Sequence, residues 1–395
     1  MRLGVNTLFL VPGEVGGTEI YLRENLRVMV SLLQQDPAIH RLLLLTTLDN
    51  DEVLRADLAT SDRVDFMCLP FRSACRPCRI VAEQTLLPLF LLRHRPDVLW
   101  SPGYTAPLLC PCPQAVTVHD LQYLSHPEDM SRLERIMQNL LVRGACRQCD
   151  RVITDSNFSR DEIVRHRMAL ASHVSVVPAG VDQSFAQIRS DASARVSALL
   201  QLPPDIPYLF CVAHSYPHKQ VHLLVEAFAL LEEQLPHHLV LVGKARRGEE
   251  VLQHGLTRLR QRQRVYRLQG LSQNDLVALF QCADIFVLPS VYEGFGLPVA
   301  EALMAGVPVV TNPLASLPEV GGVHAVYAAA PTAEAFAAAI LDVSRWPVEE
   351  RVRRVHKGRD FAARFSWHAS AASLLTLLRG LALGKDGVRS QEEAG

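Results

Sequence analysis

The stretch best suited to chemistry is a loop between a strand and a helix, with one glutamate in the loop and another in the first turns of the helix. The apolar run Ala283–Pro289 predicts a buried strand, and Gly294 and Gly296 then allow a tight turn. A helix is expected next, and its positive dipole end and first amides suit an anion. Glu293 and Glu301 flank that place. Phosphate and carboxylate sites side by side suit a ligand with phosphate and hydroxyl groups, as in a nucleotide sugar; the alternative is an ordinary corner with solvated glutamates.

Backbone and side-chain groups would share this predicted anion site. The amides are those of Gly296, Leu297 and Val299. Lys219 follows another predicted strand, where its compact ammonium group can meet a diphosphate. Glu301 can accept hydrogen bonds from both hydroxyls of a ribose. Alone, Lys219 would be as well explained as a surface charge at a helix start, but the nearby glycine loop favours a diphosphate site.

The first half of the chain adds two weaker signals. His119 and Asp120 follow the predicted strand 114–118, at its carboxyl end. Gly16 and Gly17 lie in a glycine loop between the first predicted strand and helix, which lacks the spacing of a dinucleotide fingerprint. A structural histidine at a strand end is the alternative for His119, and its place at the ligand-binding edge favours function.

The elements that position these residues alternate between strands and helices. This alternation predicts α/β architecture with parallel sheets, helices on both faces and ligands at the carboxyl ends of the strands. At 395 residues, two domains are expected. The predicted ranges are an N-terminal domain at 1–185, a linker at 186–207, a C-terminal domain at 208–365, a helix at 366–385 and a flexible tail at 386–395.

Composition restricts the classes of protein to consider. Apolar residues make up 49% and charged residues 21% of a chain with net charge -1, which indicates a globular protein and does not favour nucleic acid as a partner. The apolar segments are too short to span a bilayer, and the N-terminus reads as a strand rather than a signal peptide, so a cytoplasmic location is expected.

The nine cysteines include two C-x2-C pairs, Cys75 with Cys78 and Cys146 with Cys149. Two such pairs suit a zinc site, but about 70 residues separate them. Reduced thiols and no bound metal are the expectation.

Several blocks of the chain resemble the retaining GT-B glycosyltransferases of family 4, the group 1 type. The specific part is 283–321, which holds the Glu293 and Glu301 pair spaced E-x7-E and the block Ser316-Leu-Pro-Glu-Val-Gly. Other matching blocks are Pro217-His218-Lys219, Gly16-Gly17, His119-Asp-Leu-Gln and Val152-Ile-Thr-Asp-Ser. The resemblance covers nearly the whole chain. It implies two Rossmann-like domains facing each other across a cleft, with a C-terminal helix crossing back to the first. Residues 1–185 would form the N-terminal Rossmann-like acceptor-binding domain, and residues 208–365 would form the C-terminal Rossmann-like nucleotide-sugar-binding domain.

The resemblance also implies residue roles. Lys219 would bind the donor diphosphate, Glu301 the ribose, and Glu293 the transferred sugar. His119 would contact the sugar and orient the reacting centre. The chain departs from the family at Ala213-His214 and at His218, either of which would replace an arginine beside the diphosphate. The remaining donor-binding residues are expected to be Gly16, Gly17, His214, His218, Gly270, Leu271, Phe295, Gly296 and Leu297.

The expected reaction is transfer of a hexosyl group from a nucleotide-diphosphate sugar to a glycan or lipid-linked acceptor, without a metal or other cofactor. GDP-mannose is the first candidate donor, with UDP-sugars next. The loop with Arg72, Arg76 and Arg79 and the basic helix 131–149 suggest peripheral contact with an anionic membrane, against the alternative of a solvated face. Rival functions are a nucleotide-sugar epimerase, a phosphorylase and a non-catalytic sugar-nucleotide-binding protein.

Overall fold

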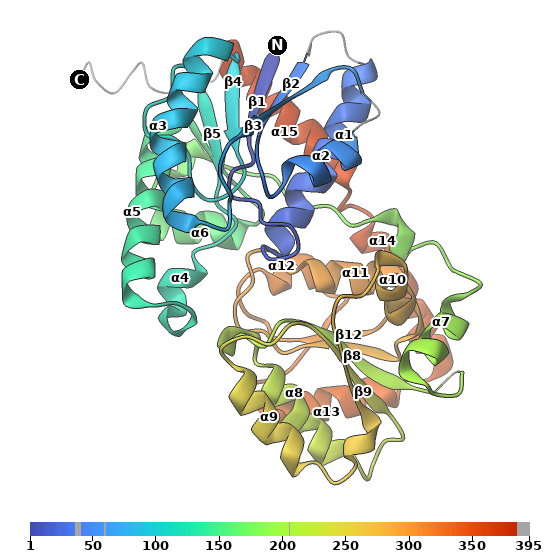
Figure 1. The fold of residues 1–395 in the computed structure, drawn as a ribbon. Helices are drawn as coiled ribbons and strands as arrows, with labels where there is room; N and C mark the ends of the chain where they lie inside the picture. The colour runs from blue at the N-terminus through green and yellow to red at the C-terminus, as the bar shows by residue number, and fades with distance from the viewer. Residues whose placement is uncertain (36–40, 59–60, 205, 385–395) are drawn as a thin grey trace. The chain divides into compact units, whose positions relative to one another are not determined.

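The computed structural model describes residues 1–35, 41–58, 61–204 and 206–384, and its contacts divide the chain into two compact units (Figure 1). Unit 1 comprises Met1–Leu124, Arg132–Gly180 and the chain from Trp367 onward. Unit 2 comprises Ser125–Ser131 and Val181–Ser366. Each unit is built around its own parallel sheet, as the alternation of strands and helices predicts.

The sheet of unit 1 has seven strands among the described residues, in the order β3-β2-β1-β4-β5-β6-β7. All pairings are parallel. Its central strands are buried on both faces, which explains their nearly continuous apolar sequences. The strands are β1 Arg2–Asn6, β2 Arg41–Thr47, β3 Val64–Leu69, β4 Val98–Ser101, β5 Gln114–Thr117, β6 Arg151–Thr154 and β7 Val174–Val176.

Helices cover this sheet. The last helix, α15, packs against the first, α1, and the two lie side by side in Figure 1. The helix α3 continues through Pro88. Ser156 caps α6 by accepting a hydrogen bond from the Ser159 amide, as its residue type favours. The helices are α1 Gly17–Gln35, α2 Asp51–Leu58, α3 Arg76–His94, α4 Gln122–Ser125, α5 Arg132–Gln148, α6 Asn157–Arg165 and α15 Trp367–Ala382.

The described part of unit 2 contains a six-stranded parallel sheet in the order β10-β9-β8-β11-β12-β13. The sheet separates α8, α9 and α13 from α10, α11 and α12 (Figure 1). Buried aliphatic side chains of α8, α13 and the strands form a core on the first of these faces. The strands are β8 Tyr208–Val212, β9 His238–Val242, β10 Val265–Leu268, β11 Ile285–Leu288, β12 Val309–Thr311 and β13 Val326–Tyr327. The helices are α7 Ala192–Leu200, α8 Val221–Leu231, α9 Glu249–Arg258, α10 Gln273–Cys282, α11 Leu297–Ala305, α12 Leu317–Gly321, α13 Ala333–Ser344 and α14 Val348–Ala362.

The strand order reverses direction beside the first strand of each unit. In unit 2 this happens between β8 and β11, which are hydrogen-bonded neighbours. Ligands of doubly wound sheets bind at such a reversal, outside the carboxyl ends of the two strands. Lys219 follows β8, and the loop with Glu293 follows β11. The topology therefore brings together two groups that are 74 residues apart.

The structure departs from the sequence-based expectation in several segments. The supposed linker 186–207 contains α7, which packs against α10 within unit 2 because Ala192, Val196 and Leu200 form one buried face. Residues 125–131, assigned from sequence to the first domain, group with unit 2. Helices α2 and α9 were not predicted. Three expectations concern residues outside the described ranges. They are the tail 386–395, residue 385 at the end of the final helix, and a strand starting at His40.

Candidate functional site

Lys219 and Glu293 form the centre of the candidate site in unit 2. The Lys219 ammonium nitrogen lies 2.7 Å from each oxygen of the Glu293 carboxylate. Both side chains are largely shielded from solvent. Lys219 ends the short turn Pro217–Lys219 after β8, and Glu293 lies in the loop after β11. The two residues expected to bind the diphosphate and the sugar of a donor therefore contact each other in the structure.

Buried polar side chains hold in place the loop 289–296 between β11 and α11, called here the Glu293 loop. The Ser316 hydroxyl lies 2.9 Å from the carbonyl oxygen of Glu293 and 2.7 Å from that of Phe295. The Asn312 amide donates to the carbonyls of Pro289 and Ser290. Ser316 and Asn312 are fully buried, so these contacts are shielded from water. The block Ser316–Gly321 of the sequence thus supports the loop.

The loop leads into α11 through Gly296. The φ angle of Gly296 is +100°, a conformation that side chains other than hydrogen strongly disfavour. Pro298 lies in the first turn, where its missing N–H is not needed. The expected anion site at Gly296, Leu297 and Val299 needs one correction. The Val299 amide already donates to the Gly296 carbonyl at 3.0 Å, because the first turn of the helix closes there.

Glu301 lies one turn into α11 and carries the most informative titration shift of the site. Burial raises the pKa of its carboxyl to about 7, and the negative charge of Asp182 contributes to the rise. A carboxyl with a pKa near neutrality is half protonated under ordinary conditions. Both of its oxygens are free of a proton, and act purely as acceptors, only when it ionises.

The other residues expected to contact the donor occupy loops of unit 2. The Nδ1 atom of His214 accepts a hydrogen bond from the Lys244 amide at 3.0 Å. The imidazole of His218 is buried, and its Nδ1 lies 2.7 Å from Asp129. Gly270 follows β10 with a φ angle of +66°. Leu271 follows it, half-buried. Their roles towards a donor stay predictions.

His119 is the centre of the candidate site in unit 1. Its Nδ1 lies 2.6 Å from Asp155 and its Nε2 lies 3.0 Å from the Pro102 carbonyl. Burial alone would lower the pKa of His119, but the Asp155 carboxylate raises it above the ordinary value. Carboxylate and carbonyl oxygens both accept hydrogen bonds, so the arrangement favours the doubly protonated imidazolium. The raised pKa of His119 therefore favours its charged form, and contact between its nitrogens and a sugar would require one of these bonds to open.

The loop after β1 places Gly16 and Gly17 at the start of α1. Gly16 has a φ angle of +57° and open space around the position of a Cβ atom. Its carbonyl accepts from the amides of Glu19 and Ile20. Both glycines are exposed. Glycine is therefore needed at residue 16 for its backbone conformation, and a role in binding phosphate stays a prediction.

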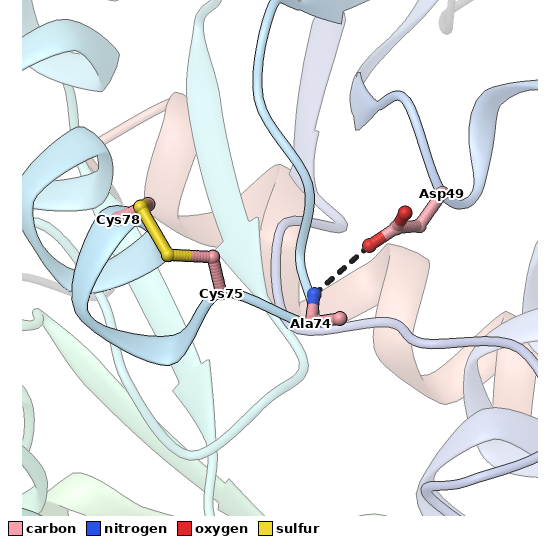
Figure 2. The surroundings of a disulfide bond; sticks show 4 residues. All are labelled: Asp49, Ala74, Cys75 and Cys78. Atoms are coloured by element: carbon pink, nitrogen blue, oxygen red, sulfur yellow. Dashed lines mark hydrogen bonds between the residues drawn. A yellow bond between two sulfur atoms is a disulfide. The ribbon is translucent and has the colours of Figure 1, made fainter.

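The cysteine pairs differ from each other. Cys75 and Cys78 are joined by a disulfide at the start of α3, so the expectation of reduced thiols is wrong for this pair (Figure 2). Cys146 and Cys149 are free and buried. Within the described residues, no group of three or more His, Cys, Asp or Glu side chains is placed to hold a metal ion.

One Asp-x-Asp triplet, Asp49-Asn50-Asp51, bears on the expectation that no metal is needed, since this spacing can hold a metal-bound diphosphate. In the structure its side chains organise the turn after β2. Asp49 accepts a hydrogen bond from the Ala74 amide at 2.9 Å (Figure 2). Asp51 accepts from Arg55 at 2.6 Å. The triplet therefore has a structural explanation, and metal independence stays a prediction.

Sequence reasoning missed the partners of the key residues. Asp129 and Asp155, the acidic partners of His218 and His119, come from elements far along the chain. Asp155 was noted only as part of a matching block, and Asp182, which faces Glu301, was not singled out. A signal existed for Asp155, which follows the strand next to that of His119.

Two family models match the chain and together span most of it. The model described as Glycosyltransferase Family 4 matches residues 15–185, and the model described as Glycosyl transferases group 1 matches residues 197–361. The O-antigen chain mannosyltransferase B of Escherichia coli is 29% identical over 64% of this chain and 66% of its own length. The O-antigen chain mannosyltransferase RfbU of Salmonella typhimurium is 25% identical over 62% of this chain and 64% of its own length. The matches thus span just under two thirds of these relatives.

Solved structures share the fold over nearly the whole chain. Sucrose-phosphate synthase from Thermosynechococcus elongatus superposes with a TM-score of 0.76 at 18% identity, over 96% of this chain and 99% of that one. Anabaena HepE, solved in complex with UDP and glucose, gives 0.75 at 20% identity, over 96% of this chain and 100% of that one. These likenesses confirm the expected GT-B fold.

Proposed function

Because this chain belongs to the group 1 glycosyltransferases of family 4, we propose that it transfers a hexosyl group from a nucleotide-diphosphate sugar to a glycan or lipid-linked acceptor. The observation that carries the proposal is the Lys219–Glu293 pair, which lies after the carboxyl ends of β8 and β11, where the strand order reverses. The N-terminus of α11 follows in the same loop. A cation and a helix N-terminus suit a diphosphate, while the two glutamates suit hydroxyl groups.

The proposed chemistry is electrostatic. As the glycosidic bond breaks, negative charge builds on the leaving diphosphate, and Lys219 with the α11 N-terminus would stabilise it. We propose retention of configuration through a front-face transfer, in which the leaving phosphate takes the proton of the acceptor hydroxyl. No divalent metal is needed in this scheme, because the lysine and the helix N-terminus neutralise the charge.

Mannose is the first candidate for the transferred sugar. The two relatives named above are mannosyltransferases by name, which supports GDP-mannose as donor. A UDP-sugar is the second candidate, supported by the Anabaena neighbour that was solved with UDP. O-antigen enzymes among the relatives support an acceptor that is a growing bacterial polysaccharide.

An exposed apolar surface on unit 1 supports contact with a membrane that carries a lipid-linked acceptor. On α5, Leu133 and Leu140 are 71% and 60% exposed, and on α3, Leu89 is 62% exposed. Leu109, in a loop that lies between the two helices in the sequence, is 77% exposed. Leu108 of the same loop packs at Gly144 of α5. The two helices carry seven arginines against two glutamates. Apolar side chains flanked by arginines suit an anionic bilayer interface.

A hydrogen bond joins the two helices of this surface. Arg76 of α3 donates to Gln138 of α5 at 2.8 Å, and the two helices lie on the same side of unit 1 in Figure 1. Arg76 and Arg79 thus serve the protein itself, since Arg79 donates to the Phe9 carbonyl. No helix in the described ranges is long and apolar enough to cross a membrane. We therefore propose peripheral binding at the cytoplasmic face, which co-sedimentation with phosphatidylglycerol vesicles and its loss in Leu133→Asp/Leu140→Asp would test.

A donor panel tests the proposed function. GDP-mannose, UDP-glucose, UDP-galactose and UDP-N-acetylglucosamine are compared by thermal shift, since a true donor stabilises the folded protein by mass action. Turnover of the stabilising sugar is then followed by NMR, which also reports the anomeric configuration of the product. The proposal requires a donor, a retained configuration and activity in EDTA. Normal turnover by Lys219→Ala or Glu293→Ala would refute the assigned site.

A further inference from the structure

Asp129 and His218 form a buried pair that has no role in the chemistry proposed above. The Asp129 carboxylate lies 2.7 Å from Nδ1 of His218. Their side chains are 3% and 2% exposed. A carboxylate so far from water is tolerated only where partners compensate its charge. The pair is therefore a built feature of unit 2 rather than a chance surface contact.

Asp129 belongs to Ser125–Ser131, a short segment that is held by unit 2 although the chain on either side belongs to unit 1. The Arg247 guanidinium donates to the Glu128 carbonyl of this segment at 3.1 Å. The His126 ring lies against the rings of His218 and Tyr292, with centroids 5.7 and 5.4 Å apart. The segment is thus attached through His126, Glu128 and Asp129, with Asp129 as the buried contact.

His218 connects this segment to the Glu293 loop. The carbonyl oxygen of His218 accepts hydrogen bonds from the Val291 amide at 2.9 Å and from the Ser290 hydroxyl at 3.4 Å. The next residue is Lys219, whose ammonium group contacts Glu293. One residue therefore contacts Asp129 through its side chain and fixes the entry to the Glu293 loop through its backbone.

The surroundings of the His218 ring hold it in this orientation. Tyr216 stacks on the ring with a centroid separation of 5.7 Å and an interplanar angle of 24°. With His126 also against the ring, the imidazole is enclosed by aromatic groups and Asp129. Swinging towards a ligand would break the bond to Asp129 and leave its carboxylate buried without that partner. His218 is thus better suited to fixing the turn than to binding the diphosphate directly.

We propose that Asp129 is a positioning residue, which holds His218 and so places Lys219 where the donor diphosphate binds. This inference rests on the proposed function, because it assumes that Lys219 meets a diphosphate. Loss of the Asp129–His218 bond frees the Pro217–Lys219 turn. Donor binding weakens as a result, while acceptor binding, which does not depend on this turn, stays the same.

Steady-state kinetics of Asp129→Ala and Asp129→Asn in the full chain test the proposal. Asp129→Ala removes the acceptor of the His218 bond, so we expect the donor KM to rise about tenfold with the acceptor KM within about twofold of wild type. The asparagine of Asp129→Asn keeps an oxygen that accepts from Nδ1–H, so this variant retains most donor affinity. Equal donor KM values for the two variants, or a parallel rise in the acceptor KM, would overturn the proposal.

A second histidine–aspartate pair, less buried than the first, provides the control: its side chains are 7% and 28% exposed. His237 lies 2.8 Å from Asp284, in the same unit but in other elements. Asp284→Ala should lower the melting temperature as Asp129→Ala does and leave the donor KM unchanged. If both variants raise the donor KM equally, the effect is general destabilisation and the proposal fails. Lys219→Ala separates the failure of the proposed function from the failure of the positioning role. If Lys219→Ala keeps wild-type donor affinity, the proposed function fails at this site. If Lys219→Ala loses donor affinity while Asp129→Ala keeps it, only the positioning role is refuted.

A double variant covers the case in which Asp129→Ala does not fold. Asp129→Leu with His218→Phe replaces both polar partners by apolar groups, which removes the buried charge together with its need for a partner. We expect this protein to fold and to keep the raised donor KM, since the hydrogen bond is absent. A donor KM equal to that of wild type would show that packing alone places the turn and would overturn the proposal.

Discussion

At the scale of single residues, the candidate site of unit 2 is organised around the opposite charges of Lys219 and Glu293. Lys219 is engaged by both oxygens of Glu293. A diphosphate offers Lys219 a second anionic partner, and the hydroxyls of the sugar offer Glu293 new donors. Binding of a complete donor therefore exchanges one ion pair for two ligand contacts. A nucleoside diphosphate without its sugar satisfies only the lysine.

Glu293→Gln tests this competition. The neutral amide no longer holds Lys219 by charge, so we expect UDP or GDP to bind about three- to tenfold more tightly, which corresponds to about 1 kcal/mol, while sugar transfer falls. Isothermal titration calorimetry measures the affinity. Glu350→Gln, which alters an exposed pair with Arg354 in the same unit, is the matched control. Weaker or unchanged diphosphate binding by Glu293→Gln would contradict the exchange.

Glu301 predicts a pH dependence of donor binding. Burial, with Asp182, raises the pKa of its carboxyl to about 7, so the folded protein favours the protonated acid below that pH. Ribose hydroxyls are held best by the carboxylate, hence donor affinity should rise from pH 6 to 7, by up to about tenfold per unit, and level off above pH 7. Titration with an intact nucleotide sugar measures this. Glu301→Gln should bind more weakly with little change over the same range, and an unaltered slope in that variant would exclude Glu301 as the cause.

At the scale of elements, the Glu293 loop shows what the sequence can and cannot predict. Glycines, a proline and two glutamates lie within one stretch, so the local strand–loop–helix pattern was predictable. The partners Asp129 and Asp155 were not. The contact of Asp155, 36 residues from His119, depends on the order of strands in a sheet, and that of Asp129, 89 residues from His218, depends on a short segment joining the other unit. The C-x2-C spacing suits both a zinc ligand pair and a disulfide, and only the structure distinguishes them. A helical stretch was expected in the supposed linker, but the proline-rich end favoured a linker over a part of unit 2, although the buried residues of α7 recur every fourth position.

Ser316→Ala tests how strongly the loop depends on its support. The substitution removes the hydroxyl that contacts the carbonyls of Glu293 and Phe295 in a fully buried place, so we expect a loss of about 1–3 kcal/mol in the free energy of unfolding. Donor affinity should fall with it, because the loop carries Glu293. Denaturant unfolding and donor titration measure the two effects. Ser344→Ala, a serine at the end of α13 whose hydroxyl contacts the Leu341 carbonyl, should change neither by a comparable amount.

At the scale of the whole molecule, the path of the chain makes unit 1 depend on its last helix. The chain leaves unit 1 at Gly180, forms most of unit 2 and returns at Trp367. Helix α15 then packs against α1, the first helix of the chain. Unit 1 is therefore complete only after the entire unit 2 has been synthesised, whereas unit 2 is continuous except for 125–131.

Truncation after Ser366 should therefore prevent unit 1 from folding. The deletion removes five large apolar side chains that are almost fully buried, and at about 1.5–3 kcal/mol each their loss is on the order of 10 kcal/mol. That figure is comparable to the entire stability of a typical domain, roughly 5–15 kcal/mol. The truncated protein should therefore aggregate through the exposed face of α1, or lose the protection of its β1 and β4 amides against hydrogen exchange. Truncation after Gly384 keeps α15 and serves as the control, with wild-type protection expected. Native protection of β1 in the shorter protein would show that unit 1 holds together without its returning helix. The side chains concerned are Trp367, Leu374, Leu375, Leu378 and Leu381.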